Sequence, residues 1–493
     1  MTRLTPARSL LLGFGLATCA ATFTQCGDGR DAPANGGAPE QTGQQVNAPS
    51  PASTQDPQPT PPADTLHLLI SGSMHGHLEP CGCASGQLGG LARRAQHIGE
   101  RRNYDLLLEG GDVVGGATEL DTLKLWTSAT VLFDMLHYDA LGVGLKDLSL
   151  GRDDYVGFLE KAPVVATNLE CTTEGWPGVP FRDKAVRDFR VRIGSLLLPE
   201  LPAELQQDET LRRTHPATAW SAAFADVDAD VLRIVMLYGD DADIRELVPQ
   251  LDPRPDLAIA IDEGYIEPNH TPIQLGDVPL VFAGIRGRVP LDARLWRENG
   301  KPRVVLEHVQ LAASKTLPGG GGDPDVKRVI LEHRQNVKDM EVLTAMANRH
   351  DTPNGATYLG SSMCKSCHAT AYQKWSESKH AHAWQTLVDA ENDPKRYGWP
   401  VTAYPDCVAC HSVGYGQKTG FETFATTPDL ANVGCERCHG PGSEHVQSGG
   451  KQKLGIIGGE LASIVCTQCH DYEQSPTFVY NERWALIEHG KEK

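Results

Sequence analysis

Positive charge and long apolar runs are both scarce in this chain. It has 45 Lys and Arg against 63 Asp and Glu, so its formal net charge is 45 − 63 = −18 over 493 residues. An acidic chain is a poor match for nucleic acid and a better one for a basic protein or a metal ion. After residue 23, no stretch approaches the roughly 18 apolar residues of a transmembrane helix. We therefore expect no nucleic-acid partner, basic redox proteins as partners, and no later membrane span.

Cysteine is plentiful and patterned. The sequence Cys-x-x-Cys-His occurs four times between residues 364 and 470. The four copies contain the cysteines Cys364, Cys367, Cys407, Cys410, Cys435, Cys438, Cys466 and Cys469 and the histidines His368, His411, His439 and His470. This spacing attaches c-type haem, because two thiols add to the haem vinyl groups and the adjacent His ligates the iron. A zinc ribbon or a disulfide framework explains one copy far better than four. We expect four covalently bound haem c groups.

The N-terminus is typical of an export signal. Arg3 and Arg8 supply positive charge before a short apolar run at residues 9–23. We predict a signal over residues 1–26. Haem c is attached outside the bacterial cytoplasm, so export and haem chemistry agree.

The segment after the signal favours a lipoprotein. Cys19 or Cys26 is the candidate lipidated residue. Residues 27–64 are rich in Gly, Pro, Gln, Ala and Ser, which predicts a flexible tether. The alternative is a soluble periplasmic protein with a disordered leader. We favour a periplasmic or outer-membrane-anchored lipoprotein that contacts the membrane only through its lipid.

Three further segments follow the tether. Residues 65–316 alternate strand-like and helix-like runs and end in a run of strands, which predicts a layered α/β domain. The expected strands are residues 66–70, 105–108, 164–167, 231–237 and 257–261, and the expected helices are residues 91–102 and 120–136. Residues 317–357 contain a Gly-rich break and a connector helix at about residues 325–348. Residues 358–493 predict a mostly α domain with little regular structure, in which porphyrin faces replace a side-chain core.

The sixth ligand of each iron decides whether a haem is a closed carrier or an open reaction site. The available histidines are His380, His382, His445, His489 and His350. His380 and His382 lie two residues apart, so on a helix they point about 200° away from each other. Three haems therefore have ready ligands in His380, His445 and His489, whereas the fourth needs His382 or His350.

Three stretches around the motifs carry a family resemblance. They are Tyr358–His368 with Trp375 and Ser378–Trp384, Gly414-Tyr-Gly, and Gly434–His445. Residues 358–490 resemble the cytochrome c-554/c-552 family of tetrahaem proteins. The resemblance implies closely stacked haems that pass electrons, with distal roles for His380 and His445. It also implies that one haem, that of His411, lacks a distal His.

The N-terminal domain carries a second resemblance. The stretches are Ser73-Met-His75-Gly-His-Leu-Glu-Pro, Gly111-Asp112 and Gly144-Leu-Lys-Asp147. Residues 65–311 resemble the calcineurin-like metallophosphatase fold of the 5′-nucleotidase type, which implies a site for two metals. Of the implied ligands, His75 and Asp112 remain, whereas Ser73 and Lys146 replace an Asp and a His. Two-metal hydrolysis needs the full set, so we expect an inactive domain.

Cys81-Gly-Cys83 lies beside His75 and His77. The four side chains could bind a metal. Alternatively, Cys171 pairs with Cys81 or Cys83 in a disulfide, which an oxidising compartment favours. We prefer the disulfide.

Three functions fit the sequence. The first is an exported tetrahaem electron carrier whose N-terminal domain is a non-catalytic scaffold or docking surface. The second is an oxidoreductase that acts on a small nitrogen or sulfur species at a five-coordinate haem. The third is a metal- or phosphoester-binding module coupled to redox state. We favour the first and expect no phosphoesterase activity.

Overall fold

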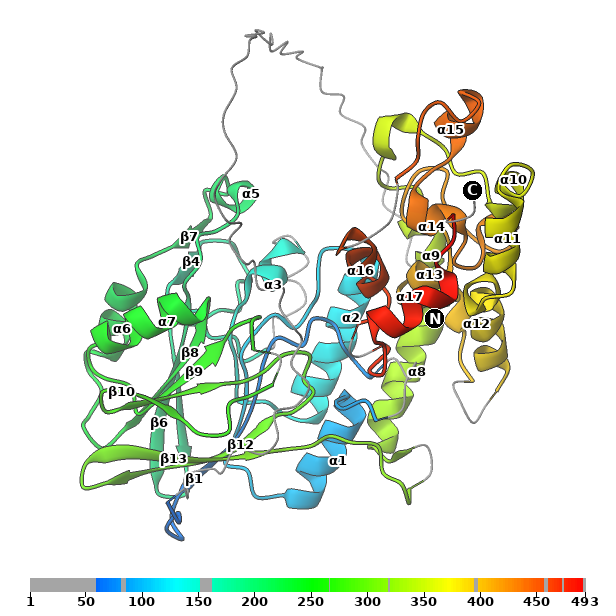
Figure 1. Ribbon diagram of the computed structural model, residues 1–493. Coiled ribbons are helices and arrows are strands. Elements are labelled where there is room, and N and C mark those ends of the chain that lie inside the picture. The colour runs from blue at the N-terminus through cyan, green and yellow to red at the C-terminus, as the bar shows by residue number, and fades with distance from the viewer. Residues whose placement is uncertain are drawn as a thin grey trace, which may run out of the picture. The chain divides into compact units, whose positions relative to one another are not determined.

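The computed structural model describes residues 59–80, 86–150, 162–265, 267–317, 320–393, 398–455, 460–471 and 474–490 (Figure 1). The expected export signal, its lipidation site and most of the tether lie outside these residues, as do Cys81 and Cys83. Within the described residues, no helix combines the length and the apolar character that a membrane crossing requires.

Two sheets form the centre of the N-terminal domain. The first has the order β13 (Lys301–His308), β12 (Leu291–Glu298), β1 (Leu66–Ser71), β2 (Leu106–Glu109) and β3 (Ala140–Leu141). The second has the order β10 (Ile273–Leu275), β11 (Val278–Phe282), β9 (Leu257–Ile261), β8 (Leu232–Tyr238), β6 (Phe189–Leu197) and β5 (Arg182–Val186). In the second sheet the central strands are parallel and an antiparallel strand closes each edge. In the first sheet β1, β2 and β3 are parallel, and the antiparallel strands β12 and β13 close one edge only. A separate two-stranded sheet pairs β4 (Leu169–Cys171) with β7 (Leu211–Arg213).

The sheets face each other across a shared core. Leu68 of β1 and Ile234 of β8 belong to one buried cluster between the sheets. Side chains alternate along a strand, so Leu69 and Val235 lie on the opposite faces. Helices cover both of these outer faces. This arrangement buries the parallel strands on both sides, and it explains why they are continuously apolar rather than alternating.

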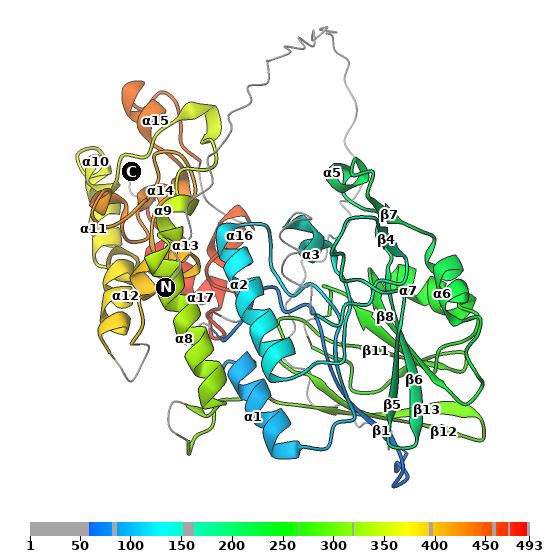
Figure 2. The ribbon, with the colours of Figure 1, turned by 180° about the vertical axis from the view of Figure 1, so that it is seen from behind.

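Helices flank the pair of sheets. α1 (Leu91–Arg101), α2 (Glu119–Ala129) and α8 (Pro324–Asp339) lie side by side over the outer face of the first sheet (Figures 1 and 2). α6 (Pro216–Phe224) and α7 (Asp241–Leu247) cover the second sheet. The predicted fold class, a layered α/β sandwich with flanking helices followed by a mostly α region, is confirmed.

Three predicted elements differ in detail. Residues 164–167 form only isolated bridges, so a strand there was wrong. The predicted helix at residues 120–136 changes from α to π geometry at Thr130. The connector helix ends at Asp339 rather than near residue 348, because Glu341 adopts a left-handed backbone with φ 54°. A short helix, α9 (Val342–Met346), follows this break.

The C-terminal region consists of short helices. They are α10 (Ser361–Cys364), α11 (Ala369–Ser376), α12 (Ala383–Asn392), α13 (Pro405–His411), α14 (Cys435–His439), α15 (Ser443–Gln447), α16 (Glu460–Thr467) and α17 (Tyr480–Ile487). The expectation that this region lacks a side-chain core was wrong. Trp384, Trp399, Val408 and Phe421 belong to a buried cluster beside the second motif. This cluster uses the aromatic residues that the sequence places between motifs.

Candidate functional site

Each Cys-x-x-Cys-His motif contains a single helical turn. The second motif completes α13, which starts with Pro405, and the third motif is α14 itself. In the first and fourth motifs, the amide of the His donates to the carbonyl of the first Cys, 2.9 Å away in both cases. On one turn, residues i, i+3 and i+4 share a face. Both thiols and the imidazole can therefore address one haem.

The four motifs lie in two pairs within the chain. The first motif contacts the third, and the second contacts the fourth. The Cys364 thiol donates a hydrogen bond to Cys435, and this bond lowers the pKa of Cys435 to about 6. The Cys410 thiol does the same for Cys469, whose pKa is also lowered to about 6. Motifs more than fifty residues apart in sequence thus place their cysteine sulfur atoms in contact, so groups attached to the two motifs of a pair would lie close together.

Glu436 fixes the first pair. This residue lies inside the third motif and is 3% exposed. Its carboxylate accepts hydrogen bonds from the amides of Leu359 (3.0 Å), Gly360 (2.7 Å) and Gly442 (2.7 Å). Leu359 and Gly360 directly precede the helix of the first motif. The buried Glu436 carboxylate accepts hydrogen bonds from these amides, and it therefore fixes the position of the third motif relative to the first.

Three motif histidines face a second imidazole. The ring centroids lie 5.9 Å apart for His368 and His445, 6.0 Å for His470 and His380, and 5.8 Å for His439 and His489. Imidazole nitrogen binds a metal at about 2 Å, so two imidazoles on opposite sides of one iron have ring centroids about 6 Å apart. The three pairs therefore have the spacing of two axial ligands. The sequence named His380, His445 and His489 but could not assign each to its motif.

His382 and His350 do not join this arrangement. Both residues are exposed, and the backbone of His350 bridges to the segment around Gln417. His411 makes no ring contact with a described residue. Its Nδ1 lies 2.6 Å from the carbonyl oxygen of Ala383.

Most of these imidazoles are oriented through Nδ1. This atom lies 2.9 Å from Gly455 O in His439, 2.8 Å from Gln452 O in His445 and 2.8 Å from Ile487 O in His489. A carbonyl can only accept, so Nδ1 carries the proton and Nε2 keeps its lone pair for a metal. Burial also lowers the pKa of His380, His411 and His470, which keeps these rings in the neutral form that binds iron.

The second and fourth motifs open onto one cavity of about 600 Å³. Cys407, Cys410, His411, Cys466, Cys469, His470 and His380 line one part of it. Thiols in pairs, a neutral imidazole beside each pair and an adjacent cavity fit covalently bound haem. The N-terminal domain and α8 complete the wall with His77, Lys124, Arg286, Arg288, His333 and Arg334. The site is therefore built by both parts of the chain.

Several contacts hold these parts together near the second motif. Lys124 Nζ lies 2.6 Å from Asp406 Oδ2, one residue before Cys407. The His333 ring on α8 hydrogen-bonds the Tyr404 hydroxyl at 3.1 Å, and the Arg334 guanidinium stacks 4.2 Å from the Trp399 ring. These contacts surround the start of α13.

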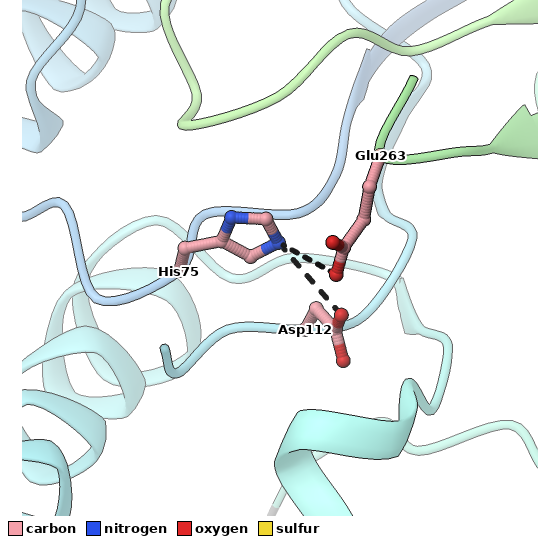
Figure 3. A group of neighbouring side chains, drawn as sticks. All are labelled: His75, Asp112 and Glu263. Carbon is pink, nitrogen blue, oxygen red and sulfur yellow. Dashed lines mark ion pairs between the residues drawn. The ribbon is translucent and has the colours of Figure 1, made fainter. Parts of the chain in front are cut away.

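The predicted phosphatase site keeps a reduced set of ligands. His75, Asp112 and Glu263 converge, with His75 Nε2 3.8 Å from Asp112 Oδ2 and 3.7 Å from Glu263 Oε1 (Figure 3). It is the one group of this kind in the described ranges. Glu263 is a residue that the sequence did not assign to the site, because it follows β9 without a recognisable motif.

The ammonium group of Lys146 lies between the side chains of His75 and Glu263. Its Nζ lies 2.5 Å from Glu263 Oε1 and 3.3 Å from His75 Nε2. The Tyr238 hydroxyl donates to Asp112 Oδ2 at 2.7 Å, so the remaining carboxylate is also engaged. Next to it, burial and the charge of Asp112 raise the pKa of Asp147 to about 8. The ammonium group of Lys146 and the hydroxyl of Tyr238 thus contact the side chains of this cluster.

Comparisons with known proteins agree with the two resemblances. Residues 363–440 match the family model described as cytochrome c554 and c-prime. Cytochrome c-554 of Nitrosomonas europaea is 39% identical over 104 residues, which cover 19% of this chain and 44% of that protein.

Solved structures are similar to the N-terminal part. A 5′-nucleotidase precursor from Thermus thermophilus has 18% identity and a TM-score of 0.44 and covers 59% of this chain and 61% of its own. The NAD nucleotidase of Haemophilus influenzae has 14% identity and a TM-score of 0.47, with 60% and 64% coverage. The chain thus spans less than two thirds of each of these relatives. Its C-terminal region is thus similar to the cytochrome c554 and c-prime family over residues 363–440, and it follows a domain with a layered α/β fold.

Proposed function

We propose that this protein is an exported tetrahaem c-type cytochrome that passes electrons through closely packed haems. The observation that carries this proposal is the cross-pairing of motifs, Cys364 with Cys435 and Cys410 with Cys469. Bound haem supplies reversible one-electron chemistry at iron, and transfer between haems needs them to be close. The chain provides that proximity by bringing distant motifs into contact.

The four attachment sites have defined residues. The first to fourth haems are held by the cysteine pairs 364/367, 407/410, 435/438 and 466/469. The three imidazole pairs supply both axial ligands to the first, third and fourth haems. Two imidazole ligands close an iron to substrates and favour electron transfer.

The N-terminal domain serves as a non-catalytic scaffold and docking surface. Two-metal hydrolysis requires carboxylates and imidazoles that clamp two ions and activate a water. Lys146 instead bridges His75 and Glu263. A positive charge in this position opposes a bound cation, so the domain is retained for its surface and not for hydrolysis.

Location and partners follow from the chemistry of the chain. Covalent haem attachment outside the cytoplasm and the N-terminal signal support a periplasmic protein, with a lipid on Cys19 or Cys26 as its membrane anchor. The net charge of −18 favours a redox partner with a basic docking face.

A second candidate function is reduction or oxidation of a small anion at the haem of His411. It is favoured by the lack of a ring partner for His411 in the described residues and by Lys124, Arg286 and Arg288 in the cavity wall. This alternative predicts a high-spin ferric haem whose spectrum shifts when nitrite or sulfite is added.

Optical reductive titration of the full chain tests the proposed function. We expect all four haems to be reduced and reoxidised reversibly, without turnover of nitrite, sulfite or p-nitrophenyl phosphate. Steady consumption of one of these compounds would contradict the carrier function.

A further inference from the structure

Arg437 connects the two motif pairs. It lies inside the third motif, between Glu436 and Cys438. Its guanidinium donates hydrogen bonds to two residues of the fourth motif, to Gln468 Oε1 at 3.3 Å and to Cys469 Sγ at 3.5 Å. A side chain of one motif thus contacts a cysteine sulfur of another motif.

The cysteines of the third and fourth motifs also lie close to each other. Burial and the neighbouring Cys466 raise the pKa of Cys438 to about 11. The first motif contacts the third, and the second contacts the fourth. The four motifs therefore follow one another in space in the order first, third, fourth and second, and Arg437 lies where the two pairs meet.

The helical turn of α14 explains the direction of the Arg437 side chain. Cys435, Cys438 and His439 share the face of this turn that addresses the haem of the third motif. Arg437 lies two residues after Cys435, so it points about 200° away from that cysteine. Glu436 contacts the residues before the first motif instead. The two middle residues of the third motif, one acidic and one basic, thus contact different neighbouring motifs.

The charge of Arg437 is fixed and partly shielded from water. A guanidinium stays protonated in proteins. The side chain is half-buried, and within the described ranges no carboxylate forms an ion pair with it. Together with the hydrogen bond from Cys410, this charge lowers the pKa of Cys469 to about 6. The guanidinium therefore acts electrostatically at a sulfur atom of the fourth motif.

A fixed positive charge also shifts the redox equilibrium of a nearby haem. Oxidation of ferrous to ferric iron adds one positive charge, and a neighbouring cation opposes that change. The cation therefore favours the ferrous form and raises the reduction potential. Outside its own helix, the Arg437 guanidinium contacts the motif that would hold the fourth haem, on Cys466 and Cys469.

We propose that Arg437 tunes electron transfer between the two pairs, because its guanidinium raises the reduction potential of the fourth haem. The inference rests on the proposed tetrahaem function and deepens it. One electron leaves the ferrous iron of the third haem, which is oxidised, and enters the ferric iron of the fourth haem, which is reduced. A higher potential at the fourth haem makes this step more favourable, so electrons are drawn from the first pair of motifs toward the second.

Potentiometric titration of the full chain, followed by haem absorbance, tests this proposal. Arg437→Gln removes the charge but keeps hydrogen-bonding groups, and one of the four midpoint potentials should fall more than the other three. Arg437→Lys keeps the charge and should leave the potentials close to those of the wild type. Lys418→Gln is the matched control, because it also removes one positive charge, from a side chain that is 59% exposed and paired with Asp351. Solvent and salt screen that charge, so the four potentials should not change.

The His380→Ala background identifies the haem whose potential falls. His380 faces His470 of the fourth motif, so its removal should make the fourth haem high-spin and give it a separate paramagnetic resonance signal. Adding Arg437→Gln to this background should lower the potential of the high-spin haem.

Unchanged potentials in Arg437→Gln would overturn the role of Arg437, as would an equal fall in Arg437→Lys or Lys418→Gln. A fall confined to the low-spin haems of the His380→Ala background would overturn the assignment to the fourth haem. Failure of the tetrahaem function is a different result, namely fewer than four haems in the wild type.

Discussion

Lys124 of α2 and Asp406 of α13 form an ion pair with 2.6 Å between Nζ and Oδ2. The Lys124 side chain is 10% exposed and that of Asp406 is 58% exposed. Attraction to Asp406 outweighs burial and raises the pKa of Lys124. Since Asp406 adjoins Cys407, this pair links the N-terminal domain directly to a haem-attachment motif.

Replacing Asp406 by Asn should weaken this link. The change leaves a buried ammonium group without its carboxylate, and partial exposure of Asp406 moderates the loss to about 1–2 kcal/mol of unfolding free energy. Urea unfolding followed by haem absorbance measures it. Asp351→Asn removes the carboxylate of an exposed ion pair, Asp351 with Lys418, whose side chains are 82% and 59% exposed. Asp351→Asn should lower the free energy of unfolding by less than about 0.5 kcal/mol. Equal effects of the two variants would contradict the role of Asp406.

The three imidazole pairs predict the result of removing each distal ligand. His445→Ala, His380→Ala and His489→Ala should each convert one haem to the high-spin state, because the opposite motif histidine remains as the sole axial protein ligand. Paramagnetic resonance with spin quantification measures the change. His382→Ala is the control, because His382 is exposed and two residues from His380. A high-spin signal in this control, with none in His380→Ala, would reverse the assignment.

The motifs and the candidate distal histidines can be named from the sequence because their chemistry is local. Cys-x-x-Cys-His lies within one helical turn, so its spacing carries the geometry of attachment. By contrast, the contact of Cys410 with Cys469 depends on how the loops between the motifs fold.

In the fold, too, features set by local sequence were predicted, whereas features set by contacts between distant residues were not. Continuous apolar runs predicted β8 and β9 because both faces of these strands are buried. The connector helix was predicted too long because its apolar spacing continues past Glu341, where the backbone turns left-handed. Glu263 could not be assigned to the phosphatase site from its neighbours in sequence. Its position depends on the packing of the loop after β9.

Glu436 predicts a strong dependence of the first haem pair on one carboxylate. Glu436→Ala leaves the amides of Leu359, Gly360 and Gly442 without their acceptor in a buried place. The expected loss is about 2–4 kcal/mol of unfolding free energy, since buried unsatisfied donors cost about 1–3 kcal/mol each and water recovers part of that. Thermal unfolding measures it. Glu444→Ala, on the nearby α15, is the control and should shift the midpoint little. A stable Glu436→Ala variant would show that the carboxylate does not hold the two motifs together.

Lys146 predicts the metal behaviour of the N-terminal domain. The wild type should take up no Mn²⁺ at His75, Asp112 and Glu263, because the ammonium group lies 2.5 Å from Glu263. Lys146→Ala removes that charge and should admit at most one ion, without hydrolysis of p-nitrophenyl phosphate, since two-metal chemistry lacks its second ligand set. Elemental analysis after dialysis and a phosphate-release assay measure both quantities. Lys146→Arg keeps the charge and should match the wild type. Hydrolysis by the wild type would contradict an inactive domain.

The central claim is that all four motifs carry covalent haem. Intact-mass analysis of the denatured full chain, with peptide mapping of the haem-bearing fragments, tests it most directly. We expect four haems per chain, one on each cysteine pair. A chain with fewer than four, or one whose motif cysteines bind zinc or form disulfides, would contradict it.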